Sequence, residues 1–166
     1  LDPDDQWLYL PALKRVKRIT SDNRSGSFVG SEFAYEDLGS QELEKYKDRK
    51  YLRKEACPNN NELECHVISR VPTEKSSGYK YQVLWLDDTA AHKVWKIDYF
   101  DRKGSHLKTL FFDDYKIYLD KHWRPSVYKM INHQTGKSTD LLVQNIKFKV
   151  GLSSRDFNPK SLSRAR

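Results

Sequence analysis

The sequence predicts a mainly β protein built as a curved antiparallel sheet, or incomplete half-barrel, with one or two short helices. From Tyr79 onward apolar and polar residues alternate, and a turn signal recurs roughly every ten residues, as in successive antiparallel strands. Aromatic residues make up 13% of the chain, and aromatic rings suit pleated strands better than helices. Sequential hairpins without long crossovers favour an up-and-down sheet over a two-layer sandwich. At 166 residues we expect one domain, 1–166.

At least nine strands are expected, and polar turn residues separate them. The strand-like segments are 6–10, 15–19, 51–56, 65–71, 81–86, 94–100, 107–112, 117–123, 127–133 and 141–150. The turns are Asp87-Asp88-Thr89, Asp101-Arg102-Lys103-Gly104, Asp113-Asp114, Arg124-Pro125-Ser126 and Thr135-Gly136-Lys137. Short helices are expected at 39–46, with Ser40 as the N-cap, and at 158–164, with Pro159 in the first turn.

The alternation assigns large apolar side chains to one inner face of this sheet. In segment 94–100, Trp95, Ile97 and Tyr99 share one face, while Lys96 and Asp98 share the other. The predicted lining of a ligand cavity is Trp85, Trp95, Ile97, Tyr99, Leu107, Phe111, Trp123 and Phe148. The same residues could instead pack a closed core. A shift of one residue in register would move each of them to the opposite face.

Cys57 and Cys65 flank a polar turn around Asn60, so they could close a small disulfide loop. Such a loop would contribute about 2 to 3 kcal/mol on the loop-entropy model. A disulfide would place the protein in an oxidising compartment such as the periplasm, whereas two free thiols would fit the cytosol. No metal site is expected, because neither cysteine belongs to a CxxC pair and His66 points away from Cys65 along a strand.

The net charge of +7 and the estimated pI of 9.3 favour anionic partners, which include nucleic acid, phosphate headgroups and acidic membranes. The densest basic stretch places Arg15 and Lys17 on one strand face and Arg18 on the other. These three residues could bind a phosphate or lipid headgroup at the mouth of a barrel. They could equally protect an exposed strand edge from pairing.

The usual local signatures of catalysis are missing from the chain, which contains no GxSxG, HExxH, phosphate-binding glycine loop or dinucleotide fingerprint. The five histidines are scattered singly, and both Asp-Asp pairs fall where turns are expected. We therefore expect no enzymatic activity and no cofactor.

Three segments carry a resemblance to a known family. QWLYLPALKRVKRI at 6–19, FVGSEFAYEDL at 28–38 and DFNPKSL at 156–162 resemble the LolA-like family of outer-membrane lipoprotein-sorting proteins. The resemblance implies an incomplete β-barrel, lidded by helices, that accepts acyl chains in the periplasm. The loop of Phe28, Gly30 and Phe33 would then be a mobile lid element. Family members look longer at the N-terminus, so we expect an incomplete copy whose open sheet edge favours self-association.

The expected function is a periplasmic carrier that shuttles a lipoprotein or lipid towards the outer membrane. Its partners would be the acyl chains, an inner-membrane transporter as donor and an outer-membrane acceptor. Two alternatives stay open, namely a lipid-binding sensor of envelope stress and a basic β domain that binds nucleic acid. The last has the weakest support, because basic and aromatic residues also alternate on any half-exposed strand, and we expect no nucleic-acid partner.

Overall fold

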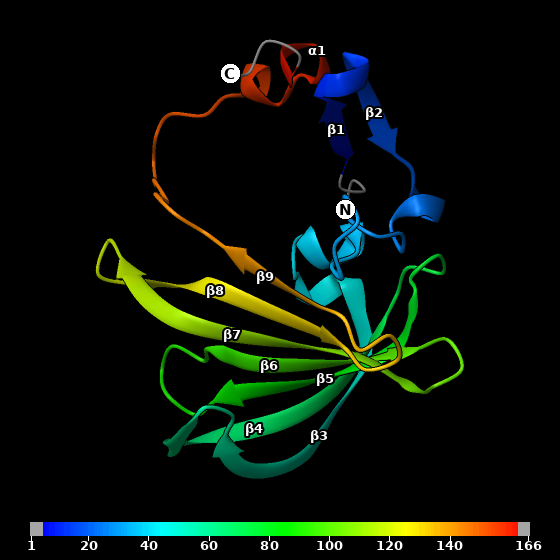
Figure 1. Cartoon of the computed structure of the whole chain (residues 1–166). Helices are drawn as coiled ribbons and strands as arrows, with labels where there is room; N and C mark the ends of the chain where they lie inside the picture. The colour runs from blue at the N-terminus through cyan, green and yellow to red at the C-terminus, as the bar shows by residue number, and fades with distance from the viewer. Residues whose placement is uncertain (1–4, 163–166) are drawn as a thin grey trace.

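Seven antiparallel strands form one curved sheet in the computed structural model, which describes residues 5–162. The strands β3 to β9 lie in the sheet in the same order as in the chain, so each connection is a hairpin (Figure 1). β3 and β9 are the two edges, and the sheet does not close into a barrel. The predicted fold class, a mainly β protein with an open, curved antiparallel sheet, is therefore confirmed.

A separate two-stranded hairpin precedes the sheet, and all helical segments are short. The strands are β1 (Gln6–Leu10), β2 (Arg15–Ile19), β3 (Tyr46–Cys57), β4 (Asn60–Pro72), β5 (Tyr79–Asp87), β6 (Val94–Asp101), β7 (His106–Tyr118), β8 (His122–Asn132) and β9 (Ser138–Leu142). The helical segments are η1 (Pro11–Leu13), η2 (Ser21–Asn23), η3 (Tyr35–Leu38), η4 (Leu43–Lys45), η5 (Ser154–Phe157) and α1 (Pro159–Leu162). Within residues 5–162, every helix is too short to cross a membrane.

Residues with positive φ turn the chain between strands. Asn59, with φ of 62°, closes the β3–β4 hairpin, and Gly104, with φ of 93°, closes the β6–β7 hairpin. In the second turn the side chain of Asp101 accepts hydrogen bonds from the backbone N–H groups of Lys103 and Ser105, both 2.9 Å long. The short polar side chain of Asp therefore fixes this turn, as the sequence predicts.

The strand register sorts side chains onto two faces. Leu84, Ile97, Leu110 and Met130 lie opposite one another on β5, β6, β7 and β8, and all four are buried. We call these four residues the inner row, and their side of the sheet the inner face. The neighbouring residue on each of these four strands points to the opposite side of the sheet, the outer face. We call these four residues the outer row. The outer row consists of Trp85, Lys96, Phe111 and Lys129.

Segment 24–45, cyan to light blue in Figure 1, packs on the inner face at one end of the sheet. Phe33 from this segment is buried against the inner row. The ammonium group of Lys108 on β7 lies 2.7 Å from a carboxylate oxygen of Asp37, and both side chains are almost fully buried. The other Asp37 oxygen accepts a hydrogen bond of 2.7 Å from the hydroxyl of Tyr79. These contacts anchor the segment to β5 and β7.

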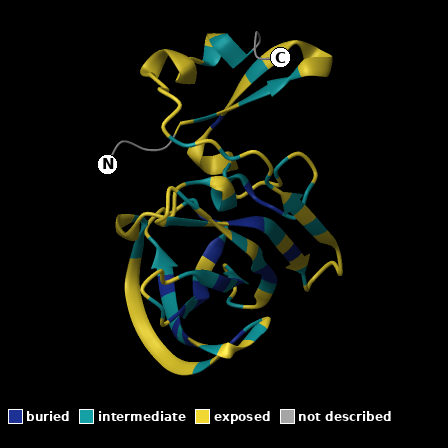
Figure 2. Cartoon of the chain, turned by 90° about the vertical axis from the view of Figure 1, so that its left-hand side faces the viewer, coloured by how far each residue is buried: buried dark blue, intermediate teal, exposed yellow. Residues whose placement is uncertain are grey.

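The β1–β2 hairpin and α1 pack together away from the sheet (Figure 1). Residues 143–158 run from β9 back to this unit, and their side chains are largely exposed, with Phe157 71% accessible. Figure 2 shows most buried residues in the sheet and almost none around the hairpin. A hydrogen bond from the side chain of Gln6 to the carbonyl of Tyr35 ties the hairpin to segment 24–45. A single domain spanning 1–166 stays a prediction.

Two predicted boundaries in β7 and β8 are wrong. Segment 117–123, expected to be a strand, contains the β7–β8 turn, in which Leu119 and Asp120 both have positive φ. The expected turns at 113–114 and 124–126 instead lie inside β7 and β8. A hydrogen bond between Ser126 and the Asp114 side chain helps these polar residues to stay within a paired ladder.

The predicted strand at 141–150 is only partly correct, because β9 ends at Leu142. The paired ladder with β8 ends where Val127 faces Leu142. The N–H of Val143 still donates to the carbonyl of Ser126, but the described residues after Val143 have no partner strand. Without a ladder to satisfy the backbone, alternation alone does not maintain a strand. Of the predicted helices, 39–46 contains η4, and the described part of 158–164 contains α1, while residues 163 and 164 lie outside the described part.

Candidate functional site

The inner face encloses a hollow of about 720 Å³ between segment 41–49, the β5–β6 loop and the β7–β8 hairpin. Its floor is apolar and comes from five neighbouring strands, β4 to β8. The floor residues are Ile68, Leu84, Leu86, Ile97, Phe112 and Tyr128. We call this space the main cavity. A mostly apolar concave site of this size is typical of small-molecule and lipid binding.

The main cavity has a basic lining. Its cationic lining residues are Arg49, Arg70, Lys93, Lys121 and Arg124, and two histidines, His92 and His122, lie beside them. None of the described residues that line the main cavity is Asp or Glu. The cavity therefore combines an apolar floor with a lining of uniformly positive formal charge.

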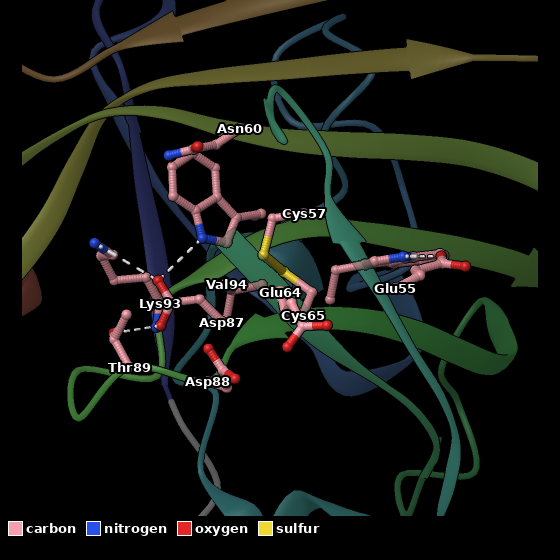
Figure 3. Close-up of a disulfide and its surroundings, with 12 residues drawn as sticks. Glu55, Cys57, Asn60, Glu64, Cys65, Asp87, Asp88, Thr89, Lys93 and Val94 are labelled. Carbon is pink, nitrogen blue, oxygen red and sulfur yellow. Dashed lines mark hydrogen bonds and ion pairs between the residues drawn. A yellow bond between two sulfur atoms is a disulfide. The ribbon is translucent and has the colours of Figure 1, made fainter. Parts of the chain in front are cut away.

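Lys93 is fixed by aromatic rings and a buried carboxylate. Its ammonium group lies 4.6 Å from the centre of the Trp123 ring and 3.6 Å from the carboxylate of Asp87. Figure 3 shows Thr89 and Lys93 directed toward Asp87. Burial would raise the pKa of Asp87, but hydrogen bonds from Thr89 and from the indole N–H of Trp95 outweigh it and lower the pKa. Asp87 is thus a stable anionic anchor for Lys93.

A disulfide supports this anchor. Cys57 and Cys65 are bonded, as predicted, and both are buried (Figure 3). They pack with Val67 and Trp85 in a cluster separate from the inner row. Because Cys65 on β4 is paired with Asp87 on β5, the disulfide holds the end of β3 next to the strand that carries the anchor.

A smaller cavity, of about 300 Å³, lies under η3 and η4. Glu36 and Tyr46 are among its lining residues, and Arg70 stacks 3.5 Å from the centre of the Tyr46 ring. Burial raises the pKa of Glu36, although Ser77 and the backbone N–H of Gly78 both donate hydrogen bonds to its carboxylate. The Glu36 carboxylate therefore already has donors within the protein, and the smaller cavity lies where segment 24–45 packs on the sheet.

Two predicted cavity residues, Ile97 and Tyr99, lie on the inner face, where Ile97 lines the main cavity and Tyr99 the smaller one. The predicted face is wrong for Trp85 and Phe111, which belong to the outer row. It is also wrong for Trp95, which packs in the disulfide cluster. A register shift at Trp95 makes it an extra residue in β6, and such a bulge turns its side chain away from the alternating pattern.

The other predicted cavity residues are spread over the sheet and its C-terminal extension. Leu107 packs against the edge of the inner row, and Trp123 lines the main cavity. Phe148, in the segment after β9, lies outside the cavity lining and contacts the rings of Tyr118 and His122, with centroids 5.3 and 5.5 Å apart.

The predicted lid residues belong to segment 24–45. Phe33 is buried in the inner-face core, Phe28 is partly buried against that core, and Gly30 lies exposed at a tight turn with φ of 78°. The basic residues Arg15, Lys17 and Arg18 all lie on β2 of the separate hairpin. They are exposed and line neither cavity.

Sequence reasoning missed most of the floor. The missed residues on the inner face are Ile68, Leu84, Leu86, Leu110, Phe112, Tyr128 and Met130. β5 and β7 carry large apolar side chains on both faces, so alternation could not choose between them. A second register shift, in the pairing of β6 with β7, leaves Leu107 as an extra residue of β7. The side chains after Leu107 therefore lie on the faces opposite to those that alternation predicts. No local sequence signal marks this shift.

The chain was compared with protein families and solved structures. A family model with the description "Uncharacterized protein" matches residues 1–164. A solved Vibrio parahaemolyticus structure, described as a "putative outer membrane lipoprotein-sorting protein domain", is 52% identical with a TM-score of 0.89, and the match covers 99% of this chain and 68% of that one. A DUF1329 family protein from Desulfovibrio piger is 27% identical with a TM-score of 0.85, and the match covers 98% of this chain and 66% of that one.

A LolA superfamily protein from Nitrosomonas europaea shares the fold, with 18% identity, a TM-score of 0.61 and coverage of 91% and 67%. The chain thus spans about two thirds of the length of each of these proteins. No curated protein matches it. Because the family model matches nearly the whole chain and the Vibrio domain is 52% identical, the chain belongs to the same family as that domain, which is described as an outer membrane lipoprotein-sorting protein domain.

Proposed function

We propose that the protein is a non-enzymatic carrier that takes the acyl chains of a lipoprotein or lipid into the main cavity. The observation that carries this proposal is the apolar floor, to which five neighbouring strands contribute side chains around a hollow of about 720 Å³. Each methylene group moved from water onto such a floor contributes about 0.8 kcal/mol before ordering costs are subtracted. Binding by this means needs no covalent step.

The relatives and the disulfide support a role between the two membranes. The Vibrio relative is described as a lipoprotein-sorting domain, and a buried disulfide suits the oxidising periplasm. The carrier would receive its cargo from an inner-membrane transporter and deliver it to an acceptor at the outer membrane. Release would require a contact that opens the main cavity.

Native mass spectrometry of the purified protein, followed by organic extraction and lipid analysis, tests this proposal. We expect a co-purified acyl-chain species and uptake of an added triacylated lipopeptide. The variants Ile68→Trp and Leu86→Trp fill the main cavity with apolar side chains and should abolish both. Ile131→Trp is the matched control, because Ile131 lies at an exposed position of β8 outside the cavity lining and should leave uptake unchanged. A protein that binds no acyl chain, or equal uptake by all variants, would overturn the proposal.

A further inference from the structure

We infer that the main cavity selects amphiphiles with an anionic headgroup, a phosphate or a carboxylate, bound by Lys121 and Arg124 beside Lys93. This inference rests on the proposed function and names the ligand class of the same site. The headgroup would lie between the β5–β6 loop and the β7–β8 hairpin, and the alkyl chain would run along the apolar floor.

The first support is the unequal distribution of charge. Acidic residues number 23 in the chain of 166, so an average set of 22 residues would contain about three. The 22 residues that line the main cavity contain none, and five of them are Lys or Arg. The positive lining is therefore a local property of the cavity and not only a consequence of the net charge of +7.

The second support is that the five cations differ in the hydrogen bonds and ion pairs that they form within the protein. The guanidinium of Arg70 donates to the side chains of Gln82 and Gln41, at 2.8 and 2.5 Å, and Arg49 donates to a backbone carbonyl. Arg124 likewise donates to a backbone carbonyl, that of Trp123, at 2.7 Å, but neither Lys121 nor Arg124 forms an ion pair with a carboxylate in the part of the chain that the structure describes. These two cations are available to an acidic headgroup.

The third support is a contact that brings Lys93 close to the β7–β8 hairpin. The ammonium of Lys93 lies over the ring of Trp123, which brings the β5–β6 loop next to the residues flanking Trp123 on β8. Arg124 follows Trp123 and lowers the pKa of the neighbouring phenol of Tyr128, whereas burial has the larger effect and raises it. A neutral phenol at this position can donate a further hydrogen bond to an acid group.

Four probes with the same dodecyl chain test the inference: dodecyl phosphate, dodecanoate, dodecyl maltoside and dodecyltrimethylammonium. Each would be titrated below its micelle concentration by isothermal calorimetry. We expect the two anionic probes to bind roughly tenfold more tightly than the maltoside, and the cationic probe to bind most weakly. The preference should shrink at about 1 M salt, where the Debye length falls to about 3 Å. The ratio between the two anionic probes distinguishes a phosphate from a carboxylate ligand.

The double variant Lys121→Gln/Arg124→Gln should lose this preference while keeping its affinity for the maltoside. Lys129→Gln/Lys137→Gln removes the same charge from exposed positions outside the cavity lining and should keep the preference. If all four probes bind equally, or if both double variants weaken anion binding alike, the inferred headgroup site is wrong and the carrier proposal stands. If no probe binds, the carrier proposal fails as well.

Discussion

Replacing Lys108 by Met tests whether segment 24–45 is a fixed part of the fold. The Lys108 side chain is 5% exposed, and the carboxylate it pairs with, on Asp37, is fully buried. The ammonium also donates a 2.9 Å hydrogen bond to the carbonyl of Glu32. Lys108→Met would leave Asp37 as a buried charge with only two neutral donors, Tyr79 and the backbone N–H of Ala34. Breaking a buried ion pair in this way costs about 3 to 5 kcal/mol.

The loss is measured by urea unfolding, with hydrogen exchange of the amides in 24–38 as a local readout. We expect exchange in this segment to accelerate together with the loss of global stability. The double variant Lys108→Met/Asp37→Asn should recover part of the loss, because no buried charge then remains unpaired. Lys116→Met removes a cation from an exposed pair on the same strand and should have little measurable effect.

A loss below about 1 kcal/mol for Lys108→Met would refute this reasoning, because it would mean that water reaches Asp37 in the native state. Rapid amide exchange in segment 24–38 of the unaltered protein would have the same meaning. It would also favour the lid role predicted for this loop over an anchored segment.

Two further predictions concern the disulfide and pH. The variant Cys57→Ala/Cys65→Ala, which opens a loop of sequence separation 8, should lose about 2 to 3 kcal/mol in urea unfolding, and an unchanged midpoint would contradict this. Because burial raises the pKa of Glu36 above 4.5, the folded state binds this proton more tightly than the unfolded state does. The contribution of Glu36 to stability should therefore fall as pH rises through the interval just above 4.5. Glu36→Gln should remove this pH dependence of the free energy of unfolding. If the pH profiles of the variant and the unaltered protein are parallel over this interval, the prediction is wrong.

Local chemistry predicted those features whose physical cause lies within a few residues. Asp101 and Gly104 specify a hairpin turn by side-chain hydrogen bonding and positive φ, and the structure has the turn there. Cys57 and Cys65 flank a turn of the right length for a bond between adjacent strands, and the bond is present. Alternation was correct for Ile97, since its strand has one polar face.

The faces of the neighbouring strands depended on interactions between strands. Phe111 and Phe112 are equally apolar, and only the extra residue at Leu107 directs Phe112 to the floor of the cavity and Phe111 to the outside. Likewise, no sequence pattern predicted that Lys108, an interior residue of β7, would meet Asp37 from a segment 71 residues away.

By itself, then, the sequence determined an open antiparallel meander, its turns at 87–89, 101–104 and 135–137, and its disulfide, because residues close together in the chain fix these features. Only the tertiary structure decided which side of the sheet is hollow and where its positive charge gathers. Bulges set the strand register, and the packing of Lys93 on Trp123 joins the β5–β6 loop to the start of β8, which is distant in the chain. Both effects arise from contacts between segments, which the order of residues along one strand does not encode.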